Sequence, residues 1–430
     1  MPPNQTPPPS DDKPQAGSVP PLPAVKHNPG GLRKLAAVLL SLFLWLFVID
    51  GILSLADDSL VLGLGTHFLS VVRVILSFLV LLLSIGVYGL MGLTPLIPKR
   101  RFLPLVLFTP AAFLVMIPSA IYFYDRMQLV GWFISAGEVV LGLIILCGIS
   151  GGFKFRRLPV TVEQLGDRSF SWANLGGFVA VNVFVLLPLV VICLFLSAAL
   201  AVDHFSEGFM ALHPGGITVQ VRKYVRNDGK TIELFPMSHV ADAGFYQKVS
   251  QTFPTNSVIL MEGVTDEHNL LTNKISYKRM AKSLGLSEQK EEFVPSRGEM
   301  VRADVDVSEF SAETLKVLNL VMLFHANGAS PEMVQQVMQY SPPPHFEDWL
   351  LEDLVTKRNQ HLLEEIKTHL SKSDNIMVPW GVAHMPGIAR EIQKTGFHLD
   401  GTQEYMVIRF GGDGKQPKDT EKQGPTTGGP

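Results

Sequence analysis

Long apolar runs separated by short polar connections occupy the first half of the chain. The runs lie at 35–55, 71–96, 103–124, 130–147 and 178–202. Each is close to or longer than the roughly 20 apolar residues that a helix needs to cross a bilayer. No convincing cleavage site follows the first run, so we interpret it as a retained span. The pattern predicts a helical membrane domain of about five spans.

The second half carries shorter patterns that change between periods of two and of about 3.6 residues. Two alternating stretches, ITVQVRKYVR and TIELFPM, flank an NDGK turn and predict a β-hairpin. Further strands are expected at 258–261, 375–378 and 405–410. Helices are expected at 241–252, 276–284, 312–325, 331–339, 346–370 and 386–395. Strands that alternate with helices predict an α/β domain with a mixed sheet.

Basic residues in the connections predict how the chain is oriented in the membrane. Lys and Arg gather before the first span, in the second connection and in the fourth; the first connection has none and the third has only Arg126. Because basic residues favour the cytoplasmic side, the N-terminus is expected in the cytoplasm. After an odd number of spans, the second half is expected in the periplasm or outside a bacterial cell.

Composition agrees with this division. The 430 residues are 47% hydrophobic and 17% charged, and the formal net charge of -3 indicates no nucleic-acid partner. Ten prolines in the first 30 residues are typical of a disordered tail. We therefore expect a tail at 1–32, a membrane domain at 33–203, an α/β domain at 205–412 and a second disordered tail at 413–430.

Glu138 lies within the fourth predicted span, where an ionised carboxylate is costly. It is either functional, or a structural residue that is protonated or paired with Arg73. The two cysteines, Cys147 and Cys193, also lie in spans, so the exported domain needs no disulfide framework.

Reactive side chains follow three predicted strands of the α/β domain. His239 follows the hairpin, Glu262 follows the strand at 258–261, and His384 follows the strand at 375–378. Strand ends in open α/β sheets form ligand-binding crevices, so we expect these side chains to lie close together. Two imidazoles and a carboxylate suit Zn, Mn or Co, although no compact metal motif such as HExxH is present.

Arg358 interrupts the apolar stripe of the long helix at 346–370. It lies between Leu354 and Leu362 at a spacing of four residues. A guanidinium on a buried stripe needs an anionic partner, and Glu262 or a substrate carboxylate would serve. Asp242 and Tyr246 lie one and two helical turns after His239, where they either support this site or only pack.

These residues resemble the TraB, PrgY and Tiki (GumN-like) family. GVAHMPGI resembles the second histidine motif of the family, FPMSHVADAGFY and VILMEGV resemble the first histidine motif and the glutamate strand, and Arg358 and Asn359 match an Arg-Asn pair on an intervening helix. The resemblance covers about 220 to 410 and none of the membrane half. The sequence departs from the family at Pro236, where the first GxxH motif has glycine.

The resemblance implies an α/β fold like those of ChaN and the erythromycin esterases (EreA). It also implies an outward-facing, metal-dependent hydrolase that acts on a peptide or protein. We expect His239, Glu262 and His384 to be either the metal-binding or the acid–base residues. Arg358 would stabilise developing negative charge or orient Glu262, with Asn359 in support, so Glu262, Arg358 and Asn359 are the candidate catalytic residues. Two alternatives remain: a non-catalytic module that sequesters a peptide or a haem-like ligand, and a domain that regulates the membrane part. The oligomeric state stays open.

Overall fold

The computed structural model describes residues 30–152, 156–272, 277–327, 335, 338–340, 343 and 345–411. By internal contacts the chain divides into two units, described separately below. The first comprises Met1–Ala112 and Gln128–Val185, and the second comprises Phe113–Met127 and Leu186–Pro430. Residues 1–29 of the first predicted tail, the whole second tail and most of the helix predicted at 331–339 lie outside the described residues, whereas Gly31 and Leu32, predicted in the tail, begin the first helix.

Five helices among the described residues are long and apolar enough to cross a membrane, which confirms the predicted number. They are α1 (Gly31–Leu64), α2 (Ser70–Leu93), α3 (Lys99–Tyr122), α4 (Met127–Ser150, after a 3-10 turn at Tyr124–Arg126) and a last helix in two parts. The last helix runs from α5 (Trp172–Val181) through a π-helical turn (Asn182–Leu186) into α6 (Leu187–Ser206). The shortest single spans have 24 residues, about 36 Å at 1.5 Å per residue, enough for a hydrocarbon core of about 30 Å.

The core of the first unit forms around α1, which is the most buried of the five helices. Leu40, Phe43 and Phe47 of α1 pack in one cluster with Val87 and Met91 of α2. Many apolar side chains of the other helices are exposed instead, as a surface against lipid requires.

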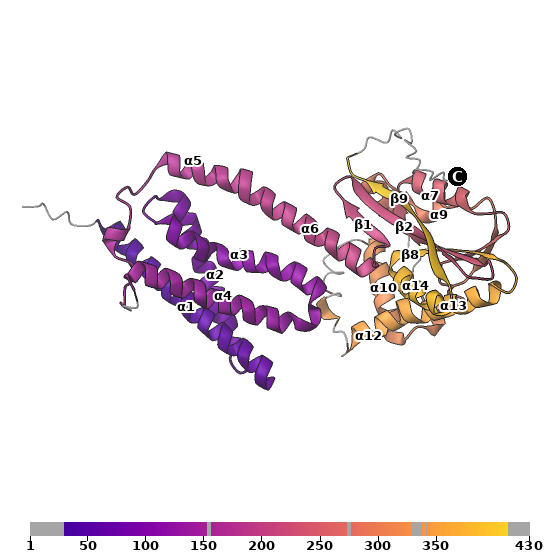
Figure 1. Cartoon of the computed structure of the whole chain (residues 1–430), viewed down its shortest axis with the longest axis horizontal. Coiled ribbons are helices and arrows are strands. Elements are labelled where there is room, and N and C mark those ends of the chain that lie inside the picture. The colour runs from indigo at the N-terminus through magenta and orange to yellow at the C-terminus, as the bar shows by residue number, and fades with distance from the viewer. Residues whose placement is uncertain are drawn as a thin grey trace, which may run out of the picture. The chain divides into compact units, whose positions relative to one another are not determined.

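The second unit is built on a mixed sheet, as the sequence predicts (Figure 1). The order β1-β2-β3-β8-β5-β7 joins β1 (Met210–His213), β2 (Gly216–Val225), β3 (Thr231–Met237), β8 (Asn375–Gly381), β5 (Ser257–Met261) and β7 (Glu299–Arg302). β9 (His398–Arg409) pairs with β2, and β4 (Val240–Ala241) pairs with β6 (Ser287–Glu288) apart from the main sheet. β3, β8, β5 and β7 are mutually parallel, whereas β1, β2 and β9 pair antiparallel.

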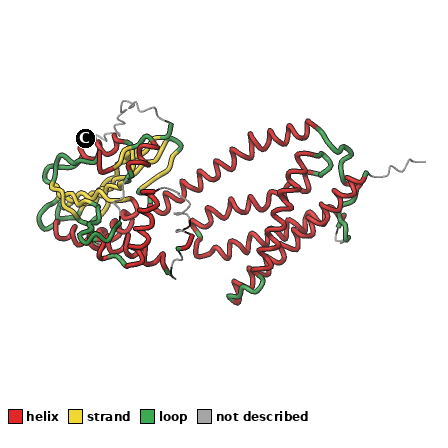
Figure 2. Tube along the Cα trace, turned by 180° about the vertical axis from the view of Figure 1, so that it is seen from behind, coloured by secondary structure: helices red, strands yellow, loops and turns green. Residues whose placement is uncertain are grey.

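Helices cover both faces of the sheet (Figure 1). On one face, α13 (Lys357–His369) and α14 (Met385–Lys394) bury Leu362 and Ile388 against Val378. On the other, α7 (Ala243–Thr252) buries Phe245 against Met377. Neighbouring residues of β8 thus point to opposite cores, which explains why its sequence is continuously apolar. The strands and their helical cover are also distinguished in Figure 2.

The remaining described helices lie between these elements in the chain. They are α8 (Lys278–Leu284), α9 (Gln289–Glu292), α10 (Ala312–Asn327) and α12 (Phe346–Leu351), with 3-10 turns at Val307–Glu309 and Val382–His384. A π-helical turn at Glu352–Thr356 joins α12 to α13 within the predicted 346–370 helix. The hairpin and the strands at 258–261, 375–378 and 405–410 are confirmed, although β8 and β9 are longer than predicted. β1, β4, β6 and β7 were not predicted.

Candidate functional site

Four side chains capable of acid–base chemistry follow the four parallel strands. His239 comes two residues after β3, Glu262 directly after β5, Asp304 two residues after β7 and His384 three residues after β8. Because these strands run in the same direction, their carboxyl ends lie at one edge of the sheet. This edge holds the candidate site.

Arg358 links the side chains that follow β5, β7 and β8. Its Nε and Nη2 donate to the two oxygens of Asp304 at 2.9 and 2.6 Å, and Nη2 also donates to Glu262 Oε1 at 2.8 Å. Nη1 donates to the carbonyl of Leu354 at 3.3 Å and faces His384 Nε2 at 3.2 Å. A guanidinium has five N–H groups, so these five contacts engage its whole donor capacity.

The surroundings of Arg358 keep it charged. The side chains of Arg358 and Asp304 are 12% and 0% exposed. Burial alone lowers the pKa of Arg358, but the hydrogen bonds and negative charges of Asp304 and Glu262 outweigh it and raise that pKa. Asp304 also accepts hydrogen bonds from the backbone N–H groups of Gly263 at 2.8 Å and Val305 at 2.9 Å. The guanidinium is therefore fixed against a carboxylate that is itself fixed by the backbone.

The buried indole ring of Trp380 packs against the guanidinium of Arg358. The guanidinium carbon of Arg358 lies 5.4 Å from the centre of the indole ring, within cation–π range. The indole N–H donates to the carbonyl of Leu260 at 2.9 Å, and the ring is fully buried. Since Trp380 belongs to β8 and Leu260 to β5, this bond joins the two strands that carry His384 and Glu262.

His384 is buried as a neutral imidazole. Its Nδ1 lies 2.7 Å from Asn359 Oδ1, and because an amide oxygen only accepts, Nδ1 carries the proton. Nε2 then offers its lone pair to Arg358. Burial, followed by the positive charge of Arg358, lowers the pKa of His384 to about 4. His384 therefore stays uncharged at neutral pH.

Two glycines lie against the side chains of this network. The N–H of Gly381 donates to Glu262 Oε2 at 2.6 Å, so both carboxylate oxygens of Glu262 have a partner. At Gly387 a Cβ atom would lie 2.8 Å from Asn359 Nδ2, a distance that real Cβ atoms do not tolerate. A glycine at 387 thus lets the Asn359 amide lie directly beside α14.

His239 lies at the same edge but outside this hydrogen-bonded network. It is exposed, and its ring stacks on Tyr277 with centroids 4.9 Å apart and planes 8° from parallel. Its charge contributes to lowering the pKa of His384. Burial and then the negative charge of Glu262 raise the pKa of Tyr277. His239 and Tyr277 are thus near enough to interact electrostatically with the buried network.

The other residues singled out in the sequence make contacts outside the network of Arg358. The Tyr246 hydroxyl donates to the carbonyl of Ser238 at 2.6 Å and so supports the turn that carries His239. Asp242 precedes α7 and accepts from the N–H of Arg409 at 3.2 Å, so its contact is with β9. Pro236 lies in β3 opposite Trp380, beyond Thr231–Leu234, where β2 pairs with β3.

The structure thus brings Glu262, Arg358, Asn359 and His384 together and adds Asp304, which sequence reasoning missed. The available signal was the rule already used for Glu262, a short strand followed by a carboxylate. The strand before Asp304 went unrecognised because β7 has the sequence EMVR and is mostly exposed, without the apolar run of a buried strand.

The donor atoms as placed do not form a metal site. Within the described residues, no group of three or more His, Cys, Asp or Glu side chains is arranged to hold a metal ion. Nε2 of His384 and Oε1 of Glu262, which would bind a cation, both face the guanidinium of Arg358. The metal therefore stays a prediction.

Comparison with protein families, curated proteins and solved structures finds no match for this chain.

Proposed function

We propose that the α/β part of the second unit, which follows α6, is a hydrolase that acts on a peptide or protein and is anchored to a membrane by the five long apolar helices. The observation that carries this proposal is the position of Glu262. Its carboxylate is held by Arg358 and by the N–H of Gly381, at the same sheet edge as the exposed His239. A fixed carboxylate and an exposed imidazole at one edge of the sheet suit general acid–base catalysis.

The contacts favour different roles for the members of the site. Glu262 would accept a proton from an attacking water, and His239, open to solvent, would exchange a proton with the substrate. Arg358 has no N–H left for a developing oxyanion, so its contacts favour the orientation of Glu262. Asp304, Asn359 and His384 act through Arg358 as positioning residues. The peptide substrate rests on the family resemblance.

We further propose that the N-terminus is cytoplasmic and that the α/β part of the second unit faces outward. Contacts within the first unit support a common side for its basic segments. Arg33, at the start of α1, donates to the carbonyls of Val162 and Leu165 in the α4–α5 connection. The N–H of Gly166 in that connection donates to the carbonyl of Leu96, in the connection before α3. The three basic segments therefore meet at one end of the helices, where the positive-inside rule favours the cytoplasm.

The test of hydrolysis uses the full-length protein in lipid vesicles and a pool of peptides, with cleavage followed by mass spectrometry. Glu262→Gln and His239→Ala should each lower cleavage by about 100-fold or more, the usual contribution of general acid–base catalysis. Glu233→Gln and His398→Ala are matched controls and should retain activity. Glu233 lies within β3, and His398 of β9 is level with Val225 and Thr231, at the amino ends of the parallel strands and away from this edge. Parallel reactions with a chelator and with Zn, Mn or Co test the predicted metal.

Cleavage that neither site variant alters would contradict the proposal. Peptide or haem binding without cleavage would instead favour the sequestering module. A reporter fused after Phe410 tests the orientation, because activity in the cytoplasm would be incompatible with an outward-facing α/β part.

A further inference from the structure

The first unit buries four carboxyl groups in its membrane-spanning helices. Asp50, Asp57 and Asp58 of α1 and Glu138 of α4 are between 2% and 8% exposed. Among the described residues, the ion pairs that they form are both with Arg73 of α2. An ionised carboxylate inside a bilayer needs a partner, so this excess of acids over bases requires an explanation.

Arg73 pairs with only two of these four carboxyl groups. It pairs with Asp58 and, at 3.3 Å, with Asp57, rather than with Glu138. Asp58 also accepts hydrogen bonds from Ser135 at 2.7 Å and from Gln128 at 3.1 Å. The guanidinium is thus shared between two carboxylates and leaves the other two acids without a basic partner.

Those two acids, Asp50 and Glu138, lie near each other. Asp50 accepts a hydrogen bond from the Ser77 hydroxyl at 2.8 Å. The side chain of Glu138 packs on α1 beside Asp50, since a Cβ atom at Gly51 would lie 3.1 Å from its Cγ. Glu138 interacts electrostatically first with Asp50 and then with Arg73, yet within the described residues it has no hydrogen bond or ion pair and is only 8% exposed. It is a buried carboxyl group that interacts electrostatically with another and has no partner among the described residues.

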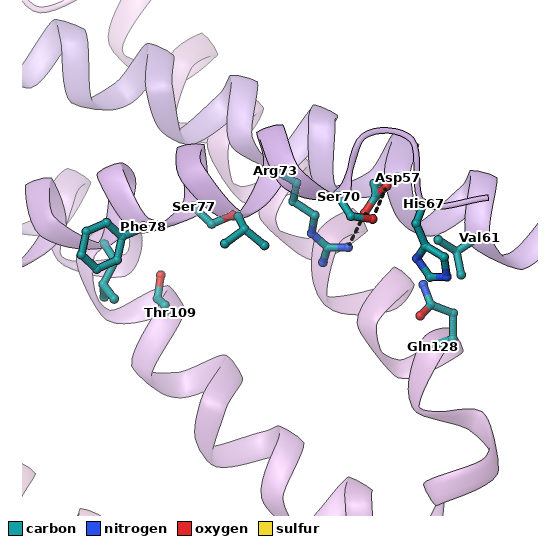
Figure 3. Close-up of a pocket in the computed structure, with 11 residues that line it drawn as sticks. Asp57, Val61, His67, Ser70, Arg73, Ser77, Phe78, Thr109 and Gln128 are labelled. Carbon is teal, nitrogen blue, oxygen red and sulfur yellow. Dashed lines mark hydrogen bonds and ion pairs between the residues drawn. The ribbon is translucent and has the colours of Figure 1, made fainter. Parts of the chain in front are cut away.

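A cavity of about 590 Å³ runs along α2 and is lined by Ser77, although not by Asp50 or Glu138 themselves (Figure 3). His67 and Gln128 line it beside the Asp57–Arg73 ion pair, and Thr109 lines its far part. Ser77 lies on the wall between them and is also the hydrogen-bond donor to Asp50. The cavity therefore connects the loop between α1 and α2 with the middle of the helices.

Two close carboxyl groups in an apolar core cannot both remain ionised without a bound cation. Carboxylate and hydroxyl oxygens bind hard cations, but Ca²⁺ takes six to eight oxygen ligands and Mg²⁺ keeps several waters. Asp50, Glu138 and Ser77 provide fewer oxygens than that. A proton or a sodium ion meets the same need with fewer ligands.

We propose that Asp50 and Glu138, with Ser77, form a binding site for a monovalent cation, a proton or a sodium ion, inside the first unit. The cavity beside Arg73 is its access route from the loop between α1 and α2. This site is independent of the chemistry proposed for the second unit and gives the membrane helices a binding function of their own.

Infrared difference spectroscopy of the full-length protein in lipid vesicles tests this site through the C=O stretch of protonated carboxyl groups. Spectra are compared between about pH 6 and pH 9, above the ordinary carboxyl pKa of roughly 4, so that exposed carboxyl groups stay silent. A proton site gives a band that disappears as the pH rises, with or without sodium. A sodium site gives a band that sodium chloride removes and choline chloride does not.

Variants assign the signal. Glu138→Gln should abolish the response, whereas Glu163→Gln, which alters an exposed carboxylate of the same unit, should leave it intact. If the ion is sodium, Ser77→Ala should weaken its binding by about tenfold, as expected for loss of one hydrogen bond to a charged group. The proposal is overturned if the wild-type protein shows no band that responds to pH or sodium, or if the responding band persists in Glu138→Gln.

Discussion

Replacing Arg358 with methionine tests the central interaction of the candidate site. Methionine is apolar and flexible, so it largely fills the space of the arginine without its charge or its five donors. The change leaves Asp304, whose side chain is 0% exposed, with only its two backbone hydrogen bonds. Glu262, 10% exposed, keeps only the bond from the N–H of Gly381.

We expect this substitution to destabilise the second unit by about 3–5 kcal/mol, the usual cost of removing one partner from a buried ion pair. Most of that cost comes from the charge left in the interior, above all on Asp304, and less from the lost attraction. Adding Asp304→Asn to Arg358→Met should therefore recover part of the loss. The two changes share one interaction, so their effects should depart from additivity by about 0.5–3 kcal/mol.

The measurement is hydrogen exchange of the full-length protein in detergent micelles, followed at amides of β8. Central strands exchange only when the surrounding unit opens, so their protection reports its free energy of unfolding. Arg226→Met is the matched control. Arg226 contacts Asp228 through the same Nε and Nη2 atoms, but the two side chains are 30% and 44% exposed. An exposed pair contributes little, so the control should be nearly neutral.

Equal losses in the two methionine variants would refute the reasoning, because burial would then not determine the cost. Failure of Asp304→Asn to recover any stability in the Arg358→Met background would also count against it. That result would place the cost in packing around the methionine rather than in an unpaired charge.

Three further outcomes are expected. As the pH falls from 6.5 to about 4, His384 takes up a proton in the unfolded chain but not in the folded protein. The wild type should therefore lose up to about 3 kcal/mol of stability relative to His384→Gln, measured by pH-dependent unfolding. Gly387→Ala should push the Asn359 amide away from His384 and lower the rate of cleavage in a kinetic assay. Adding Asn359→Ala to Gly387→Ala should not lower that rate further, because both changes remove the same interaction. Trp380→Phe should cost about 1–3 kcal/mol in the same hydrogen-exchange assay, since it leaves a buried carbonyl without its donor.

Membrane helices and the hairpin were predictable because local patterns determine them. A run of apolar residues long enough to cross a bilayer is identified without knowledge of its neighbours. The Asn-Asp-Gly turn likewise favours a hairpin locally, and Gly229 adopts a φ of 84° there. The same reasoning missed β7, because an exposed edge strand lacks the apolar pattern on which it relies.

The partners of Arg358 could not all be predicted, because they depend on the order of the strands. Its position on a buried stripe indicated that it needs an anion, and Glu262 was a correct candidate. Asp304 became the principal partner only because β7 pairs in parallel with β5. Strand order is set by the packing of whole elements, which no short stretch of sequence encodes.

The sequence by itself determined the division into an apolar helical half and an α/β half, and the types of side chain that follow β3, β5 and β8. Each of these properties depends on residues close together in the chain. Only the tertiary structure decided which charges meet: Arg73 with Asp57 and Asp58, and Arg358 with Glu262 and Asp304. Charges in low-dielectric surroundings pair with whatever lies within a few ångströms, and that distance is set by the packing of helices and strands far apart in sequence.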